Sequence, residues 1–254
     1  MGVTQKSSPL ANFGLIAICV IIALVVFMGA GFGKTTFKMR ENCYAVPNKF
    51  LFSSPFLENL LQNLQDLQFD ESGAEMYLRF PARYVAEKVP GYTIWVHEEG
   101  GIKDDVTPIF GELSPENVRY IESGIHDQHL WTATGDYSDD GLGQEIIWDD
   151  GVQLFRVYFA KISRGWTFVD LDPRMIDEDL PSGNHVIAGC RNPSGINDGS
   201  YSCLHSTLRG NFSIEYYLND NNFPLYREID DFIFEEIESW KFGVLTETGD
   251  CRIE

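Results

Sequence analysis

The sequence predicts an α+β domain with a largely antiparallel sheet and two or three amphipathic helices, preceded by an N-terminal transmembrane helix. Three observations support this fold class. A long uncharged segment lies near the start, short runs rich in β-branched and aromatic residues alternate with turn formers, and two segments repeat apolar residues at helical spacing. Of the 254 residues, 44% are hydrophobic, which is enough to build a core and excludes wholesale disorder.

The uncharged segment is the predicted membrane anchor. No charged residue lies between Lys6 and Lys34, and residues 13–33 hold about the 20 apolar residues that cross a bilayer as a helix. The apolar core of a cleaved signal peptide is usually about 7 to 15 residues, so an uncleaved signal anchor fits the length better. We expect a tail at 1–12, the anchor at 13–33, a stalk at 34–42 and one acidic domain at 43–254.

The part of the chain beyond the anchor is strongly acidic. Residues 1–40 contain four basic residues and no acidic one, so a net charge of −19 for the whole chain leaves −23 on residues 41–254. Such a surface repels the phosphate backbone of nucleic acids and attracts basic proteins. We expect a basic protein partner, membrane contact through the N-terminal helix, and no nucleic acid.

Four cysteines lie outside the predicted anchor, an even set typical of an oxidising compartment. Three pairings are possible. We prefer Cys190 with Cys203, because this bond closes the turn-rich segment between them, and Cys43 with Cys251, which ties the start of the domain to its end. Four reduced and buried thiols are the alternative.

The charges that flank the anchor and the cysteines disagree about which side of the membrane the domain lies on. Lys34, Lys38 and Arg40 follow the anchor whereas Lys6 precedes it, a bias that would place the domain in the cytoplasm. The cysteines favour an extracytoplasmic domain, periplasmic in a Gram-negative cell. We expect a single-pass protein with its C-terminal domain outside the cytoplasm.

Periodicity divides the domain into helices and strands. Apolar residues recur every three or four positions over 56–67 and, after Pro224, over 225–240. The strongest hairpin signal is Asp149, Asp150 and Gly151, because glycine tolerates the positive φ of such a turn. Strands are expected at 74–80, 92–97, 129–134, 145–148, 152–160, 166–170, 185–190 and 212–218.

An acidic loop is the candidate site for a partner. Asp136, Ser138 and Asp140 follow the rhythm of a calcium loop, but Ile147 occupies the twelfth position, where a bidentate Glu is needed. We therefore predict no metal site. The exposed carboxylates of Asp136, Asp139 and Asp140 are expected to meet a cationic partner.

A histidine cluster suggests an alternative, enzymatic function. His126, Asp127 and His129 would supply metal ligands or a base with its orienting carboxylate. No HExxH, G-x-S-x-G, P-loop or G-x-G-x-x-G accompanies them, so we predict no catalytic residue and no cofactor, and retain an envelope hydrolase as the alternative. A membrane-tethered sensor or assembly factor, packing through the small residues 29–31, is another.

The stalk ends in ENCYAVPNKFLF, with Cys43 and Pro47, and leads into one acidic α+β domain without catalytic motifs. This layout resembles membrane-tethered periplasmic immunity proteins that neutralise type VI secretion effectors. The resemblance implies a non-enzymatic inhibitor that covers the active site of a toxin. It implies no particular binding residues, because no motif corresponds position by position.

Overall fold

The structure is a computed structural model that describes ten segments of the chain. The predicted anchor, apart from its last residue, and the predicted helix over 56–67 lie outside the described residues. Within those residues, no helix is long and apolar enough to cross a membrane. The described segments are 33–39, 41–52, 75–95, 104–125, 127–132, 144–159, 165–175, 181–192, 200–246 and 248–253.

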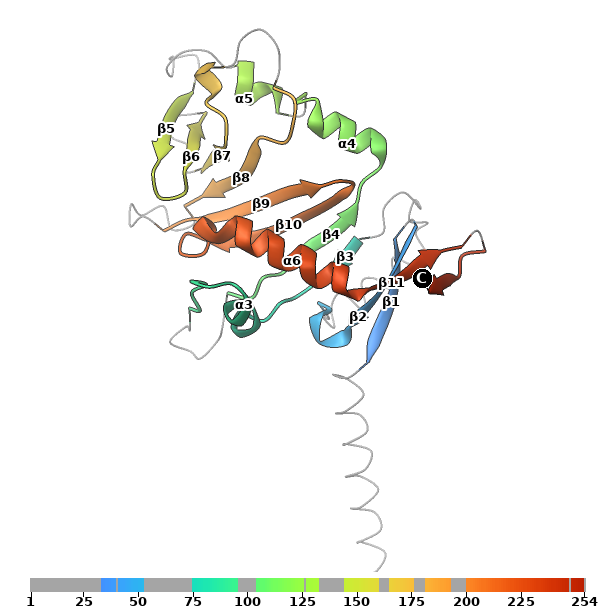
Figure 1. The fold of residues 1–254 in the computed structure, drawn as a ribbon. Coiled ribbons are helices and arrows are strands. Elements are labelled where there is room, and N and C mark those ends of the chain that lie inside the picture. The colour runs from blue at the N-terminus through green and yellow to red at the C-terminus, as the bar shows by residue number, and fades with distance from the viewer. Residues whose placement is uncertain are drawn as a thin grey trace, which may run out of the picture.

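An antiparallel sheet of eight strands forms the centre of the described fold (Figure 1). Its order is β3-β4-β10-β9-β8-β7-β6-β5, so the last six strands in sequence form a continuous meander. This sheet agrees with the predicted α+β class. Its strands are β3 Glu75–Tyr77, β4 Ile109–Glu112, β5 Glu145–Asp149, β6 Leu154–Tyr158, β7 Gly165–Val169, β8 Val186–Arg191, β9 Ser202–Arg209 and β10 Phe212–Asn219.

Helix α6, Tyr226–Trp240, packs on one face of this sheet and agrees within one residue with the helix predicted over 225–240. The 3-10 turn η3, Phe223–Leu225, leads into it. At its end Trp240 stacks on Phe80, with ring centroids 5.9 Å apart. The buried apolar stripe of the helix consists of Ile229, Phe232, Ile233, Ile237 and Trp240.

The opposite face of the sheet carries a smaller core at its β5 end. Helix α5, Gln128–Thr132, places Leu130 and Trp131 in a cluster with Val157 of β6 and Val169 of β7. Both α5 residues are buried, and two consecutive side chains cannot both point to one face of a strand. The strand predicted over 129–134 is therefore wrong, since its described part is a helical turn.

Two further short helices flank the sheet. Helix α3, Ala82–Lys88, begins after Pro81, and α4, Pro115–Glu122, begins after Ser114. The described part of the strand predicted over 92–97 is irregular instead. Its backbone bonds to a side chain rather than to a strand: Asn222 accepts from the Thr93 amide at 2.8 Å and donates to the Thr93 carbonyl at 2.9 Å.

A second, four-stranded antiparallel sheet adjoins the large one, in the order β1-β2-β11-β12. Met39, in the segment predicted as a stalk, is fully buried in the main core, and Phe37 packs against that core. Residues 34–39 and 42, within the segment predicted as a stalk, are therefore strand residues of this sheet. The strands are β1 Lys34–Met39, β2 Asn42–Pro47, β11 Lys241–Leu245 and β12 Cys251–Ile253, and the 3-10 turn η1, Asn48–Phe50, follows β2.

Cys43 of β2 is bonded to Cys251 of β12, with their Cα atoms 5.9 Å apart. Strand β11 lies between these strands, and a Cβ added at Gly243 would stand 2.1 Å from the Arg252 carbonyl oxygen. The close approach of β12 therefore requires glycine at this position. The second bond joins Cys190 to Cys203, which face each other across β8 and β9. Both bonds are the expected ones.

The predicted hairpin at Asp149 connects β5 to β6. Its tight part is held by the Asp149 side chain, which accepts from the Gly151 amide at 2.9 Å. The positive φ of 58° falls on Gln153 rather than on Gly151, so the expected role of the glycine is wrong. The loop is longer than a two-residue turn, and its left-handed residue comes at the end.

Candidate partner-binding face

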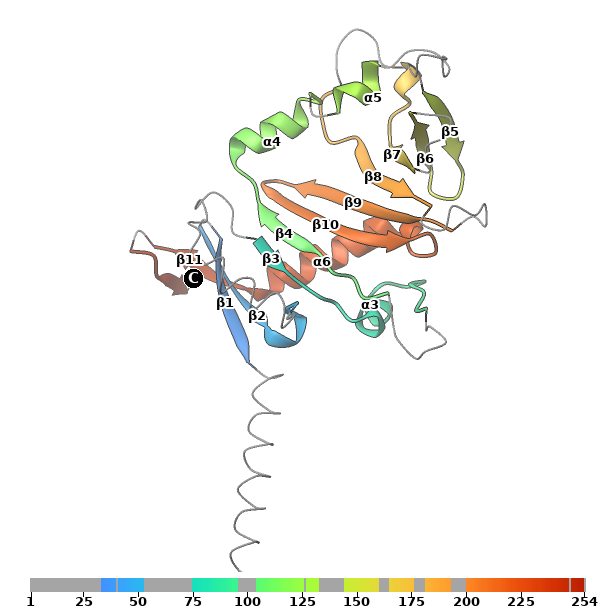
Figure 2. The ribbon, with the colours of Figure 1, turned by 180° about the vertical axis from the view of Figure 1, so that it is seen from behind.

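Figure 2 shows the side of the large sheet that faces away from α6, with β3, β4, β10 and β9 as neighbouring strands. Side chains of β3, β9 and β10 are exposed on this side. Along β10, Ile214, Tyr216 and Leu218 are buried toward α6, and the alternate positions point the other way. We call this surface the open face. By register and alternation it comprises Glu75, Tyr77, Ile109, Ser206, Ser213, Glu215 and Tyr217.

Two tyrosines stand out from the open face. Tyr217 is 57% exposed and Tyr77 is 41% exposed, although tyrosine usually buries much of its ring. Tyr77 donates to the Glu75 carboxylate at 2.9 Å, and this bond raises the pKa of the Tyr77 hydroxyl. Tyr77 pairs with Ile109, which pairs with Glu215, so Tyr77 and Glu215 lie two strand spacings apart, about 10 Å.

The charge of the open face is negative. Glu75 and Glu215 are exposed on it. At its border, Arg79 is neutralised by Asp105, which accepts from the Arg79 Nε at 2.6 Å. Arg191, at the end of β8, adds one positive charge on the same side. Two exposed carboxylates on a sheet surface favour a cationic partner.

A polar hollow of about 540 Å³ lies where β10 ends. Asp104 forms part of its lining, is only 8% exposed, and accepts from the Asn219 side chain at 2.7 Å and from the Trp95 amide. Burial raises the pKa of the nearby Tyr92 hydroxyl. The lining comprises Phe52, Arg79, Tyr92, Asp104, Asp105, Thr107, Ser202, Tyr217, Leu218, Asn219 and Asn222.

An apolar hollow of about 320 Å³ lies between α4 and the other end of the open face. Ser114 caps α4 by accepting from the Asn117 amide at 3.1 Å, and Pro115 takes the first helical position. The lining comprises Leu113, Asn117, Tyr120, Ile121, Asp127, Asn184, Val186, Ser206, Thr207, Leu208 and Ser213.

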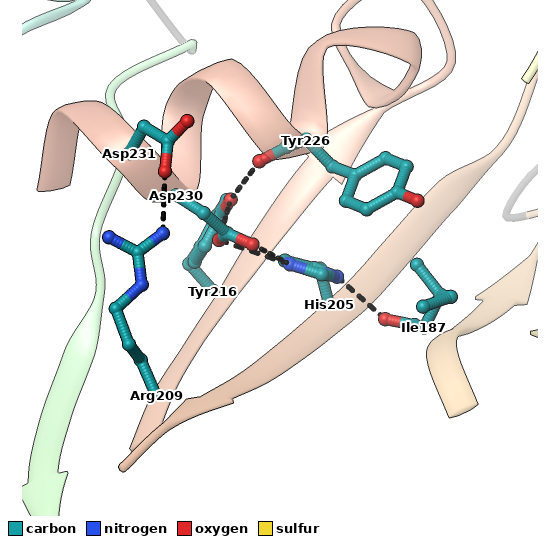
Figure 3. A network of polar contacts seen from close by, with 7 residues as sticks. All are labelled: Ile187, His205, Arg209, Tyr216, Tyr226, Asp230 and Asp231. Carbon is teal, nitrogen blue, oxygen red and sulfur yellow. Dashed lines mark hydrogen bonds and ion pairs between the residues drawn. The ribbon is translucent and has the colours of Figure 1, made fainter. Parts of the chain in front are cut away.

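A buried polar network fixes the sheet beneath the open face to α6 (Figure 3). His205 of β9 is 1% exposed, and its Nδ1 lies 2.6 Å from the Ile187 carbonyl oxygen. A carbonyl only accepts, so Nδ1 carries a proton. The Nε2 atom lies 3.0 and 3.1 Å from the two carboxylate oxygens of Asp230, so a further proton is held between the ring and the carboxylate.

Tyr216 completes this network from β10. Its hydroxyl lies 2.8 Å from an Asp230 carboxylate oxygen and 3.2 Å from the Tyr226 carbonyl oxygen (Figure 3). Burial, reinforced by the Asp230 charge, raises the pKa of the Tyr216 hydroxyl well above its ordinary value. These residues open to neither hollow, so their role is to hold β8, β9, β10 and α6 in one arrangement.

The candidate residues chosen from sequence fall elsewhere. Asp136, Asp139, Asp140 and His126 lie outside the described residues. Asp127 lines the apolar hollow, and the backbone of position 129 belongs to α5. Within the described segments, no group of three or more His, Cys, Asp or Glu side chains is placed to hold a metal ion.

The open-face residues were missed by sequence reasoning, although a signal for them exists. The predicted strand over 212–218 alternates, with Ser213, Glu215 and Tyr217 on one side. That alternation separates a polar side from a buried one. It does not say that the side chains of Glu75, Tyr77, Glu215 and Tyr217 are exposed together in the described structure, and that exposure is what makes the surface a candidate site.

Comparison with known proteins gives little support to any single family. No family model matches the chain, and no curated protein matches it. One similar solved structure is an immunity protein of the Stenotrophomonas maltophilia type IV secretion system, with a TM-score of 0.44 and 8% identity over 83% of this chain and 94% of that one. That protein belongs to a type IV system, so the type VI assignment is not supported. A likeness of this degree carries no functional argument.

Proposed function

We propose that the chain is a membrane-anchored, non-enzymatic, extracytoplasmic binding protein of the immunity or inhibitor kind, whose open face binds a basic protein. The observation that carries this proposal is the exposure of Glu75, Glu215, Tyr77 and Tyr217 together on one sheet surface. Carboxylates beside exposed tyrosines supply attraction and contact area at once. The acidic loop with Asp136, Asp139 and Asp140 is proposed as a further contact.

The proposed placement has two separate supports. The uncharged residues 13–33 have the length of a transmembrane helix, and they would hold the domain at the membrane. The bonds of Cys43 with Cys251 and of Cys190 with Cys203 are of a kind that persists in oxidising compartments. A tethered inhibitor would meet an incoming toxin before it reached its target.

The charge on the domain would act mainly on the rate of encounter. At physiological salt, screening limits the range over which exposed charges interact to about 8 Å. Only carboxylates close to the contact therefore steer the partner. Glu75 and Glu215 are close enough if the partner docks on the open face. The buried contact then depends on Tyr77 and Tyr217, whose aromatic rings bury a large area at low entropic cost.

The proposal is tested by photocrosslinking in cells that make the full-length protein. A photoreactive amino acid is placed at Tyr217 on the open face and, as a matched control, at Glu235 on the exposed side of α6. We expect a discrete adduct with a basic protein from position 217 alone, and its loss when Glu215→Lys is added. Adducts from both positions, or from neither, would overturn the proposed face.

A further inference from the structure

We propose that the apolar hollow receives one apolar side chain of this basic partner, flanked in the partner by lysine or arginine. The inference rests on the proposed function and adds the chemical character of the partner's contact segment. It concerns the space between α4 and the open face, which Ile121 and Leu208 line from opposite sides.

The hollow exists because small side chains face a helix. On the sheet side the lining includes the open-face residues Ser206 and Ser213, neither of which is long enough to fill the space under α4. Within α4 Val118 is the buried residue, at 8% exposure. Protein interiors normally pack to a density of about 0.75, so a helix seated over serines leaves an unfilled gap.

The size and lining of the hollow suit an apolar side chain. Its volume of about 320 Å³ is at the lower end of the range in which ligand pockets fall, about 300 to 1,000 Å³. Leu113, Ile121, Val186 and Leu208 supply aliphatic surface, and Tyr120 at the rim is 49% exposed. A side chain that enters would cover apolar surface that water contacts at present.

The charges near the hollow indicate which residues flank this side chain in the partner. Asp127 lines the hollow, and the surface of α4 carries two exposed carboxylates, Glu116 and Glu122, against one exposed cation, Arg119. Glu215 lies further along the open face, two residues from Ser213 of the lining. Cations on either side of the apolar residue would meet carboxylates.

The hollow is formed in advance of binding. The Leu113 amide donates to the Asn211 carbonyl at 2.8 Å, which ties the start of α4 to the turn between β9 and β10. The Gly183 amide donates to the Glu122 carbonyl at 2.7 Å, which holds the end of the helix to the segment before β8. A site fixed at both ends loses little conformational freedom on binding, so an anchor residue gains more there.

The first test maps the contact itself. A photoreactive amino acid at the exposed position Ser206 is crosslinked in cells, and the adduct is sequenced by mass spectrometry. We expect the bond to fall on an apolar residue of the partner with lysine or arginine within three positions. An adduct with a lipid, with a second copy of this chain, or with an acidic segment would overturn the inference.

The second test separates this inference from the proposed function. Ser206→Trp fills the hollow, and Ser239→Trp on the exposed side of α6 is the matched control. The dissociation rate is measured with the purified partner that the crosslink at position 217 identifies. We expect Ser206→Trp to raise this rate at least tenfold, and Ser239→Trp to leave it unchanged. Ile121→Ala, which removes lining instead of adding bulk, is expected to act in the same direction.

Each failure has a distinct signature. If Glu215→Lys slows association while Ser206→Trp and Ile121→Ala leave dissociation unchanged, the open face binds the partner but the hollow is no anchor. If no substitution on the open face alters binding, the proposed function is refuted as well. Thermal unfolding of each variant, compared with that of the parent, shows whether a loss of binding reflects a loss of folding.

Discussion

Replacing Asp230 by alanine is expected to cost about 2.5 to 4 kcal/mol of folding stability. The change removes a charge-assisted hydrogen bond to His205, worth about 1.5 to 3 kcal/mol, and the hydrogen bond to Tyr216, worth about 1 kcal/mol. Tyr216 keeps the Tyr226 carbonyl as an alternative acceptor, which limits the loss on that side. The total agrees with the cost of about 3 to 5 kcal/mol for breaking a buried pair.

The neighbouring residue in α6 provides the control. Asp231 pairs with Arg209 at 2.5 Å, but the two side chains are 65% and 53% exposed, so Asp231→Ala should cost less than about 1 kcal/mol. Both substitutions remove one carboxylate from the same helix (Figure 3). Their difference therefore measures the effect of burial and of the network.

The assay is equilibrium unfolding in urea with the disulfides intact, followed by circular dichroism. For a domain of this size the denaturant slope is about 2 to 3 kcal/mol per molar urea, so Asp230→Ala should lower the midpoint by about 1 M or more. A further expectation is that Asp230→Ala and His205→Leu together cost less than the sum of the two. Equal midpoints for Asp230→Ala and Asp231→Ala would refute the role assigned to the buried network.

Three other predictions follow from the fold. Gly243→Ala places a Cβ against the Arg252 carbonyl oxygen and should cost about 1 to 3 kcal/mol, which urea unfolding would detect. Cys251→Ser opens a loop with a sequence separation of 208 and should cost about 2 to 5 kcal/mol, which would appear as a lower melting temperature. Reducing agent should then lower the melting temperature of this variant by less than it lowers that of the parent. Burial, the largest cause for both, raises the pKa of Tyr84 and of Tyr201 to about 12, whereas an unfolded tyrosine ionises near pH 10. The unfolded state loses its protons first, so the contribution of these two tyrosines to stability should be fully present below pH 10 and be lost between pH 10 and 12. A flat pH titration of the urea midpoint across that range would contradict this.

Of the two helical periodicities in the sequence, the one over 225–240 falls on described residues and is confirmed by α6. The apolar stripe that ends at Trp240 could be assigned because it repeats over four turns and packs on a sheet. Strands with clear alternation, such as β10, could be assigned for the same reason. The positions of the cysteines along the chain also favoured the observed pairing, since one bond closes a short turn-rich segment and the other joins the two ends of the domain.

Elements held by long-range pairing left weaker signals. Strand β9, SCLHSTLR, reads as polar because its buried positions include His205, whose partner Asp230 lies 25 residues away. Strand β1 is mostly exposed and is defined by its pairing with β2, so it resembles a stalk in sequence. The open face could not be predicted because its exposure depends on where α4 and α5 pack, which local patterns do not encode.

The most direct test of the central claim is the association rate of the partner captured at position 217, measured by stopped flow at several salt concentrations. The comparison uses the parent, Glu215→Lys on the open face and Glu235→Lys on α6, which change the net charge equally. We predict that Glu215→Lys slows association several-fold at low salt, with a difference that shrinks as salt rises, and that Glu235→Lys has a much smaller effect. Equal slowing by both variants would show that net charge, and not the open face, directs the encounter.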